Sequence, residues 1–170
     1  MTKNKVLIPV TRSESSRKIL PYVESLLPAQ QNELILLYVT KPPRAIGIAA
    51  PDPDSGYALD PGGDPVGPKT HPIYAHQQEG SLEADAEAEL LPTVQRLSNQ
   101  GYSVSVSVCF TDEPAQEIIR LMKKHGVDVI AMSTRARDGV MRFFFGDIAD
   151  HVMRKVDIPV LLVNPKDSSE

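Results

Sequence analysis

The sequence predicts an α/β fold in three layers, a parallel sheet between two layers of helices, on two observations. Short apolar runs such as Val6–Val10 and Leu34–Val39 have no polar alternation, which is typical of strands buried on both faces. The segments between such runs repeat apolar residues with a period near 3.6, which is typical of helices packed on one side. Strands that alternate with helices predict a doubly wound sheet with right-handed crossovers.

The first strand, Val6–Val10, is followed by a predicted helix over about 14–27, with Ser13 as its N-cap. Pro21 falls inside this helix and is expected to kink it. The second strand follows at Leu34–Val39. The side chains expected to face the core from the helix are Ile19, Tyr22, Val23, Leu26 and Leu27.

Residues 40–77 differ in composition from the rest of the chain. They hold 8 of its 15 prolines and 5 of its 10 glycines, with few aliphatic residues. Such a segment buries too little apolar surface to offset the entropy lost on ordering. We therefore predict a single domain over 1–165 with an insertion at about 40–77, and a disordered tail over 166–170.

A helical pattern resumes after the insertion and ends near Gly101, a natural C-terminal glycine. Pro92 lies within this pattern and predicts a kink or a split. The next strand, Tyr102–Phe110, alternates valine with serine, which favours an edge position. The expected inward residues of the helix are Leu82, Ala86, Leu90, Val94 and Leu97, and its expected acidic outer face is Glu83, Asp85, Glu87 and Glu89.

The remaining elements complete the alternation. A helix is predicted from Asp112-Glu113-Pro114 to Gly126, because proline is tolerated in a first helical turn. A strand follows at Val127–Met132, a helix at Gly146–Lys155 and a last strand at Pro159–Val163. The inward residues expected of the last two helices are Ala115, Ile118, Ile119 and Met122, then Ile148, Ala149, Val152 and Met153.

Composition excludes several classes of protein. The chain has 170 residues and a net charge of −4, which argues against broad binding to nucleic acid or to an anionic membrane. With Cys109 as its only cysteine, it cannot form an internal disulfide. The longest apolar run, Ile158–Val163, is too short to span a bilayer, and no signal peptide is evident. A cytoplasmic protein is expected.

Signatures of catalysis are missing from the sequence, so we expect no enzyme. It contains neither a phosphate-binding G-x-x-x-x-G-K-[ST] loop nor a G-x-S-x-G nucleophile elbow. Cys109 lies in a strand, where it is expected as a small buried side chain. His71 and His76 lie in the insertion, and no metal site is predicted there. His125 and His151 are expected at a helix end and on an outer helix face.

The segment Met132–Val163 is the most informative part of the chain. It resembles the universal stress protein family, whose members carry a loop of the form G-x2-G-x9-G-[ST], then a helix and a P-V-L-V-V-like strand. The Ile8-Pro9-Val10 opening and the Glu113-Pro114-Ala115 helix start are similar to the family as well. The resemblance implies a five-stranded parallel sheet of order 3-2-1-4-5. It also implies a homodimer through the last strand, 159–163.

Many members of that family bind ATP, and the resemblance implies where this chain departs from them. The three loop glycines correspond to Ser133, Ala136 and Gly146, and the hydroxyl position corresponds to Asp147. A carboxylate about 4 Å from a phosphate oxygen costs up to roughly 4 kcal/mol at an effective dielectric constant near 20. Thr11 stands where the family has an aspartate that holds the nucleoside.

We therefore expect a regulatory protein of the stress response, with weakened or lost ATP binding and no obligatory cofactor. The alternative is a protein that binds ATP or another adenine nucleotide through an altered loop, in which Arg135, Arg137 and Arg142 contact phosphate. An enzyme of phosphoryl or adenylyl transfer, and a docking surface for a protein partner, are further alternatives. The residues expected around a bound nucleotide are Pro9, Val10, Thr11, Val39, Met132, Ser133, Arg135, Ala136, Arg137, Gly146, Asp147 and Ile148.

Overall fold

The structure, a computed structural model, describes residues 2–42, 72–134 and 147–164. Two compact units share the chain: residues 1–42 with 86–170 form one, and residues 43–85 form the other. We call the described residues of the first unit the main body. The described part of the second unit is the helical segment 72–85. The domain boundaries given above stay a prediction.

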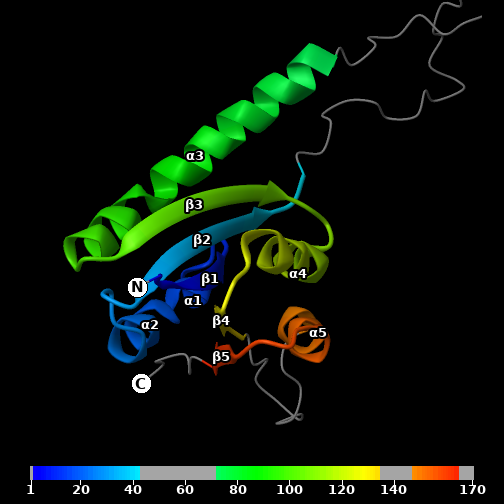
Figure 1. Cartoon of the computed structure of the whole chain (residues 1–170). Coiled ribbons are helices and arrows are strands. Elements are labelled where there is room, and N and C mark those ends of the chain that lie inside the picture. Colours follow the sequence, from blue (N-terminus) through cyan, green and yellow to red (C-terminus); the bar gives the residue numbers. More distant parts are fainter. Residues whose placement is uncertain (1, 43–71, 135–146, 165–170) are drawn as a thin grey trace, which may run out of the picture. The chain divides into compact units, whose positions relative to one another are not determined.

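The main body is built on a five-stranded parallel sheet (Figure 1). Its order, β3-β2-β1-β4-β5, and its parallel pairings confirm the predicted fold class. The strands are β1 (Asn4–Val10), β2 (Asn32–Thr40), β3 (Ser103–Phe110), β4 (Val129–Ser133) and β5 (Val160–Val163).

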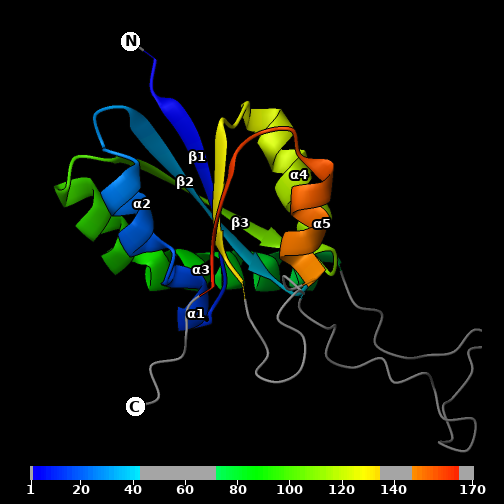
Figure 2. The same ribbon diagram turned by 90° about the horizontal axis from the view of Figure 1, so that it is seen from below.

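Helices cover both faces of the sheet (Figure 2). One face packs against α2 and residues 86–99 of α3, and the other face packs against α4 and α5. The helices are α1 (Glu14–Arg17), α2 (Leu20–Leu26), α3 (Pro72–Asn99), α4 (Pro114–His125) and α5 (Asp147–Lys155).

The strands are apolar on both faces, as their sequence predicts. Successive side chains of a strand point to opposite faces. In β1, Val6 and Ile8 join the core under α2 and α3, while Leu7 joins the core under α4 and α5. All three side chains are fully buried. This double burial is the physical reason that the run has no polar alternation.

The predicted helix over 14–27 is wrong as one element. The chain forms α1 and α2 instead, and Pro21 lies in the first turn of α2, where its missing N–H costs no helical hydrogen bond. Ser13 occupies the N-cap position of α1, but its side chain makes no capping bond. The break rotates α2, so Leu20 joins Ile19 and Val23 in the core.

Some side chains predicted to face the core are exposed. Tyr22 and Leu26 are exposed on α2, because the break after α1 shifts the helical phase. Ile148 is exposed in the first turn of α5, while Ala149 and Val152 are buried. On α3, which runs through Pro92 without a split, Leu82 is exposed.

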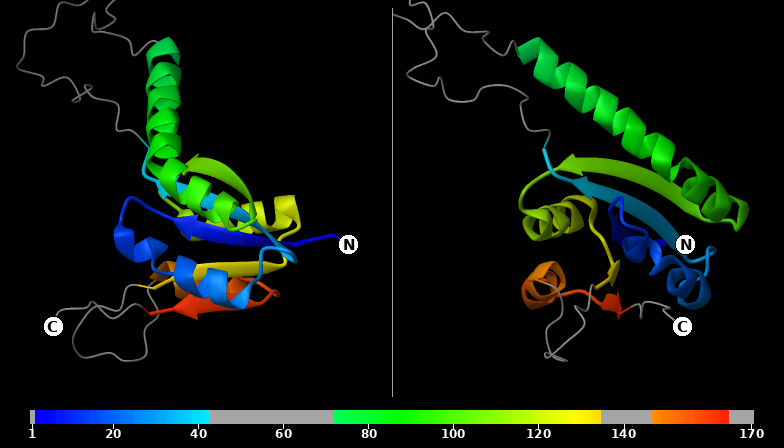
Figure 3. Two further views of the ribbon diagram at one scale, coloured as in Figure 1. Left: turned by 90° about the vertical axis from the view of Figure 1, so that its left-hand side faces the viewer. Right: turned by 180° about the vertical axis from the view of Figure 1, so that it is seen from behind.

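The ends of the elements follow the expected turn chemistry. Gly126 ends α4 with φ of +60°, and Gly101 follows α3 with φ of +93°, both in the left-handed region that glycine tolerates best. The valine–serine alternation of β3 is matched by its place at the edge of the sheet. Because the strands are parallel, their carboxyl ends lie together at one end of the sheet. At this end, α1 follows β1 (Figure 3).

Candidate functional site

In an open parallel α/β fold, a ligand is expected at the end of the sheet that carries the carboxyl ends of the strands, which we call the carboxyl edge. Here β1 ends at Val10, β2 at Thr40 and β4 at Ser133. The Ser133 hydroxyl donates to the backbone oxygen of Ser16 in α1 at 3.5 Å. The turn after β1 and the end of β4 therefore meet at this edge, and we call this place the carboxyl edge site.

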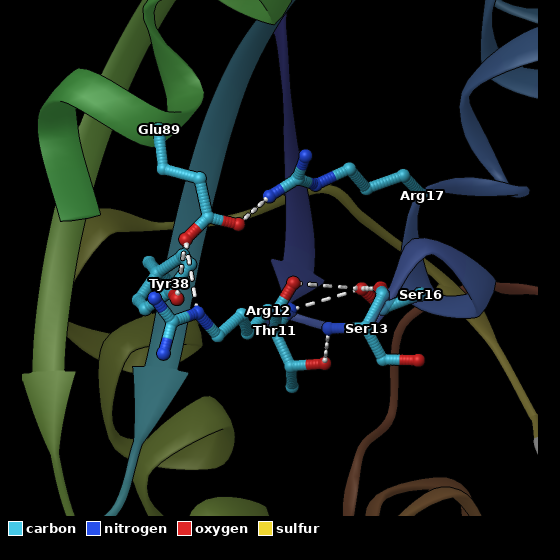
Figure 4. Close-up of polar contacts among 7 residues, drawn as sticks. All are labelled: Thr11, Arg12, Ser13, Ser16, Arg17, Tyr38 and Glu89. Carbon is cyan, nitrogen blue, oxygen red and sulfur yellow. Dashed lines mark hydrogen bonds and ion pairs between the residues drawn. The ribbon is translucent and has the colours of Figure 1, made fainter.

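Hydroxyl groups hold the turn between β1 and α1 (Figure 4). The Ser16 hydroxyl oxygen accepts the Thr11 N–H at 3.0 Å and lies 2.7 Å from the Ser13 carbonyl oxygen. The Thr11 hydroxyl oxygen accepts the Ser13 N–H at 3.2 Å. Thr11 is thus engaged in fixing the backbone of its own turn, and it supplies no negative charge to a ligand.

A cluster of charged and polar side chains lies beside this turn (Figure 4). Glu89, on α3, accepts hydrogen bonds from the Tyr38 hydroxyl at 3.1 Å and from the Arg17 guanidinium. The Nε of Arg12 lies 3.9 Å from the second carboxylate oxygen, Oε2. We call Arg12, Arg17, Tyr38 and Glu89 the Glu89 cluster. It joins β2, α3 and the segment after β1.

Burial differs sharply within the Glu89 cluster. The side chains of Arg17 and Glu89 are 24% and 29% exposed, whereas that of Arg12 is 91% exposed. Burial raises the pKa of the Tyr38 hydroxyl above its ordinary value, and the hydrogen bond to Glu89 raises it further. Tyr38 therefore remains a neutral donor to Glu89 at neutral pH.

Glu89 corrects the prediction of an acidic outer face on its helix. The neighbouring Glu87 is exposed as expected, but Glu89 turns toward Arg17 and Tyr38. Its partners lie 72 and 51 residues away along the chain. A periodicity argument assigns charged residues to solvent, so it cannot detect a carboxylate that is neutralised by distant partners.

The structure spreads the predicted apolar site residues over both faces of the sheet. Val10 is buried in the core under α2 and α3, whereas Val39 and Met132 are buried in the core under α4 and α5. This follows from the register, which pairs Val10 with Tyr38 and leaves Val39 one residue further along β2. Pro9 is half-buried within β1.

Asp147 is the first residue of α5 and is exposed. Because α5 starts at the same end of the sheet as α1 (Figure 2), we take this helix start as the other end of the carboxyl edge site. A carboxylate in a first helical turn interacts favourably with the helix dipole. Four predicted site residues lie outside the described part of the chain, as does Arg142. These four are Arg135, Ala136, Arg137 and Gly146.

The sequence reasoning missed all four members of the Glu89 cluster. Tyr38 offered one signal, because it is the one residue of the run Leu34–Val39 whose side chain carries a polar group. A buried tyrosine hydroxyl needs a hydrogen-bond partner, so Tyr38 predicts a polar partner near the end of β2. The sequence alone does not show that this partner is Glu89.

Cys109 carries no sign of reactivity. The thiol is half-buried, and burial together with a hydrogen bond to Glu117 raises its pKa to about 11. His125 ends α4, and His151 is exposed on α5, as expected. The pair His71 and His76 lies outside the residues whose side chains are described.

The described residues offer neither a metal site with several protein ligands nor a helix that could span a membrane. No group of three or more His, Cys, Asp or Glu side chains among them is arranged to hold a metal ion. None of the helices in the described part of the chain combines the length and the hydropathy that a membrane span requires.

Comparison with known proteins relates nearly the whole chain to one family. The sequence model of the universal stress protein family matches residues 3–164. The universal stress protein MJ0577 of Methanocaldococcus jannaschii is 21% identical over 173 residues, which cover 96% of each chain. The solved structure of MJ0577 superposes with a TM-score of 0.68 at 23% identity, over 99% of this chain and all of that one.

Two further solved structures share the fold. A universal stress protein family protein of Arabidopsis thaliana, At3g01520, solved with AMP bound, has a TM-score of 0.58 at 16% identity. It is covered over 93% of its length, by 96% of this chain. A universal stress protein in complex with cAMP has a TM-score of 0.54 at 14% identity, over 98% of this chain and all of that one.

Proposed function

The chain belongs to the universal stress protein family, and we propose that it is a non-enzymatic regulatory member in which ATP binding is weakened or lost. One observation carries the proposal. Asp147 begins α5 and is exposed at the carboxyl edge site, at the position where the family motif has a serine or threonine. A phosphate drawn to this helix end would meet a negative charge already there.

The electrostatic cost is large enough to matter. Two unit charges about 4 Å apart repel by about 1 kcal/mol in water and by about 4 kcal/mol at an effective dielectric constant near 20. Because 1.4 kcal/mol corresponds to a tenfold change in affinity, the carboxylate lowers the affinity for a phosphate by about five- to a thousandfold. Asp147 also takes the favourable interaction with the helix dipole that a phosphate would otherwise have.

Thr11 supports the same conclusion from the opposite side of the site. Its hydroxyl oxygen accepts the Ser13 N–H, and its own N–H is bound by Ser16. An aspartate in this place could accept two hydrogen bonds from a nucleoside, whereas the threonine has one hydroxyl proton to offer. The nucleoside end of a ligand is therefore held less firmly than in relatives that carry the aspartate.

Restoring the family residues tests the proposal. We expect the double variant Thr11→Asp, Asp147→Ser to bind ATP at least about tenfold more tightly than the parent in calorimetric titration. Asp150→Ser is the matched control, since it removes a neighbouring carboxylate of α5 without restoring the motif hydroxyl. An affinity that is equal in the parent and the double variant would refute the role given to these two residues.

A second candidate function is binding of another adenine nucleotide, and the relatives solved with AMP and with cAMP favour it. These ligands carry fewer negative charges than ATP, so they suffer less from Asp147. A nucleotide released on heat denaturation of the purified protein would support this function. Arg137→Ala should then lower the yield of nucleotide, and an unchanged yield would remove Arg137 from the site.

We further propose that the protein acts in the cytoplasm as a homodimer through β5. This strand lies at the edge of the sheet, and all four of its residues are only half-buried in the single chain. A second β5 would pair the open backbone groups of this edge. Light scattering at micromolar concentration should give twice the chain mass, and a monomer mass would contradict the dimer.

A further inference from the structure

Positive charge in the Glu89 cluster exceeds what the cluster itself neutralises. The Glu89 carboxylate is already satisfied by the Tyr38 hydroxyl and by the Arg17 guanidinium. Arg12 approaches it only to 3.9 Å, beyond hydrogen-bonding distance, with 91% of its side chain exposed. Two guanidinium groups thus face one carboxylate at the end of β1.

The two arginines are held to very different degrees. The side chain of Arg17, the last residue of α1, is mostly buried and binds Glu89 of α3. Its Nε is buried without a hydrogen-bond partner in the described part of the chain. The ion pair of Arg12 with Glu89 is exposed on the Arg12 side and 3.9 Å long, and such pairs contribute little to stability. It can therefore turn from Glu89 toward another anion at small cost, while Arg17 stays in place and adds to the local positive potential.

We propose that Arg12, supported by Arg17, forms a binding site for a phosphate group beside the Thr11 turn. The ligand class is inorganic phosphate or a phosphate monoester, because a guanidinium binds such an oxyanion through two parallel hydrogen bonds. The Thr11 hydroxyl, whose oxygen accepts the Ser13 N–H, retains its proton as a further donor. The site goes beyond the function proposed above, since Arg12, Arg17 and Glu89 are not among the residues expected around a nucleotide and Thr11 alone is shared.

Glu89 sets the affinity of this site as an internal competitor. Its carboxylate draws Arg12 back and repels an incoming anion. Glu89→Gln removes the charge but keeps an amide oxygen that can accept from the Tyr38 hydroxyl. Loss of one negative charge about 6 Å from the ligand raises its affinity about threefold in water. A purely structural role of Glu89 predicts no such gain.

The test is a titration of the full-length, ¹⁵N-labelled protein with inorganic phosphate at constant ionic strength. Arginine Nε–Hε signals report the site directly, and the signal lost in Arg12→Gln identifies Arg12. We expect a saturable shift of that signal in the parent protein, and about threefold tighter binding in Glu89→Gln. In Arg12→Gln, we expect binding at least about tenfold weaker, followed through the Thr11 and Ser13 amides.

Arg154→Gln is the matched control, because Arg154 is an exposed arginine paired with Asp150 on α5, at the other face of the sheet. It should change the phosphate affinity less than about twofold. Equal affinities in all variants, or weaker binding in Glu89→Gln, would overturn the site. If Glu89→Gln does not fold, Arg12→Glu replaces it. The phosphate-induced shifts of the Thr11 and Ser13 amides must vanish in this variant, and undiminished amide shifts overturn the proposal. None of these outcomes depends on whether ATP binds.

Discussion

The two ends of the carboxyl edge site differ in how their charges are used. Beside β1, the Glu89 carboxylate is held by Arg17 and Tyr38, and the turn is held by the Ser16 hydroxyl. At the start of α5, the Asp147 carboxylate is exposed. Beside β1, hydrogen bonds of Glu89 and Ser16 join segments of the chain. At the start of α5, Asp147 exposes its charge to solvent.

Residues of the first kind stabilise the carboxyl edge site, and residues of the second kind determine which ligand it binds. A group that links several elements affects stability when it is removed, because it leaves buried partners without hydrogen bonds. An exposed group at a helix end affects stability little but changes what can approach it. We therefore expect mutation of Glu89 or Ser16 to act mainly on folding stability, and mutation of Asp147 to act mainly on ATP binding.

The largest effect is expected from Glu89→Ala. It leaves the mostly buried Arg17 guanidinium and the buried Tyr38 hydroxyl without their acceptor. Since both ion-pair partners are about a quarter exposed, we expect a loss of about 2–4 kcal/mol in the free energy of unfolding by urea. Glu87→Ala, an exposed neighbour on α3, should cost less than about 0.5 kcal/mol. Similar losses of unfolding free energy in both variants would show that Glu89 contributes no more to stability than an exposed carboxylate.

Ser16→Ala tests the turn after β1. The substitution removes the oxygen that accepts the Thr11 N–H, at a site that is only partly exposed. We expect a loss of about 1–2 kcal/mol by urea denaturation. Ser25→Ala is the control, because its hydroxyl bonds an exposed carbonyl oxygen of α2 and should contribute less than about 0.5 kcal/mol. A silent Ser16→Ala would show that the turn holds without its hydroxyl.

Asp147→Asn tests the opposite end. Losing a charge from the first turn of α5 should lower stability by only about 0.3–1 kcal/mol. Asp150→Asn, which loses the exposed pair with Arg154, should cost a similar or smaller amount. A loss above about 2 kcal/mol in Asp147→Asn would mean that Asp147 holds structure, as Glu89 does.

The smallest effect is a dependence on alkaline pH. Burial and then Glu89 raise the pKa of Tyr38 above 10.0, so the folded state favours the neutral hydroxyl. This stabilisation is complete below pH 10 and is lost as pH rises through the folded-state pKa. Tyr38→Phe should therefore lose less stability than the parent between about pH 9 and 11. Identical slopes of unfolding free energy against pH would contradict the placement of Tyr38.

The fold was largely predictable because burial leaves a local trace in the sequence. The apolar run of β1 and the valine–serine alternation of β3 each report which faces of a strand are covered. Resemblance to a family supplied the order of the strands. The break between α1 and α2 was missed because Pro21 was taken as a kink inside one helix, although proline equally marks a helix start.

The candidate site was predictable only where a motif names its residues. Asp147 and Thr11 were assigned to the site by their motif positions, and this assignment stays a prediction. Glu89 was assigned to solvent by its helical period. Its contacts with Tyr38 and Arg17 bring together residues more than fifty positions apart, and no local pattern encodes such a pairing. A polar group at the end of an apolar strand, as in Tyr38, is the local sign that such a partner exists.

Calorimetric titration of the unaltered protein with ATP and Mg²⁺ decides whether the carboxyl edge site disfavours a triphosphate. We expect no saturable heat at micromolar ATP, because the carboxylate of Asp147 lies at the helix end that would receive the phosphates. Saturable, stoichiometric binding at micromolar ATP would contradict this expectation.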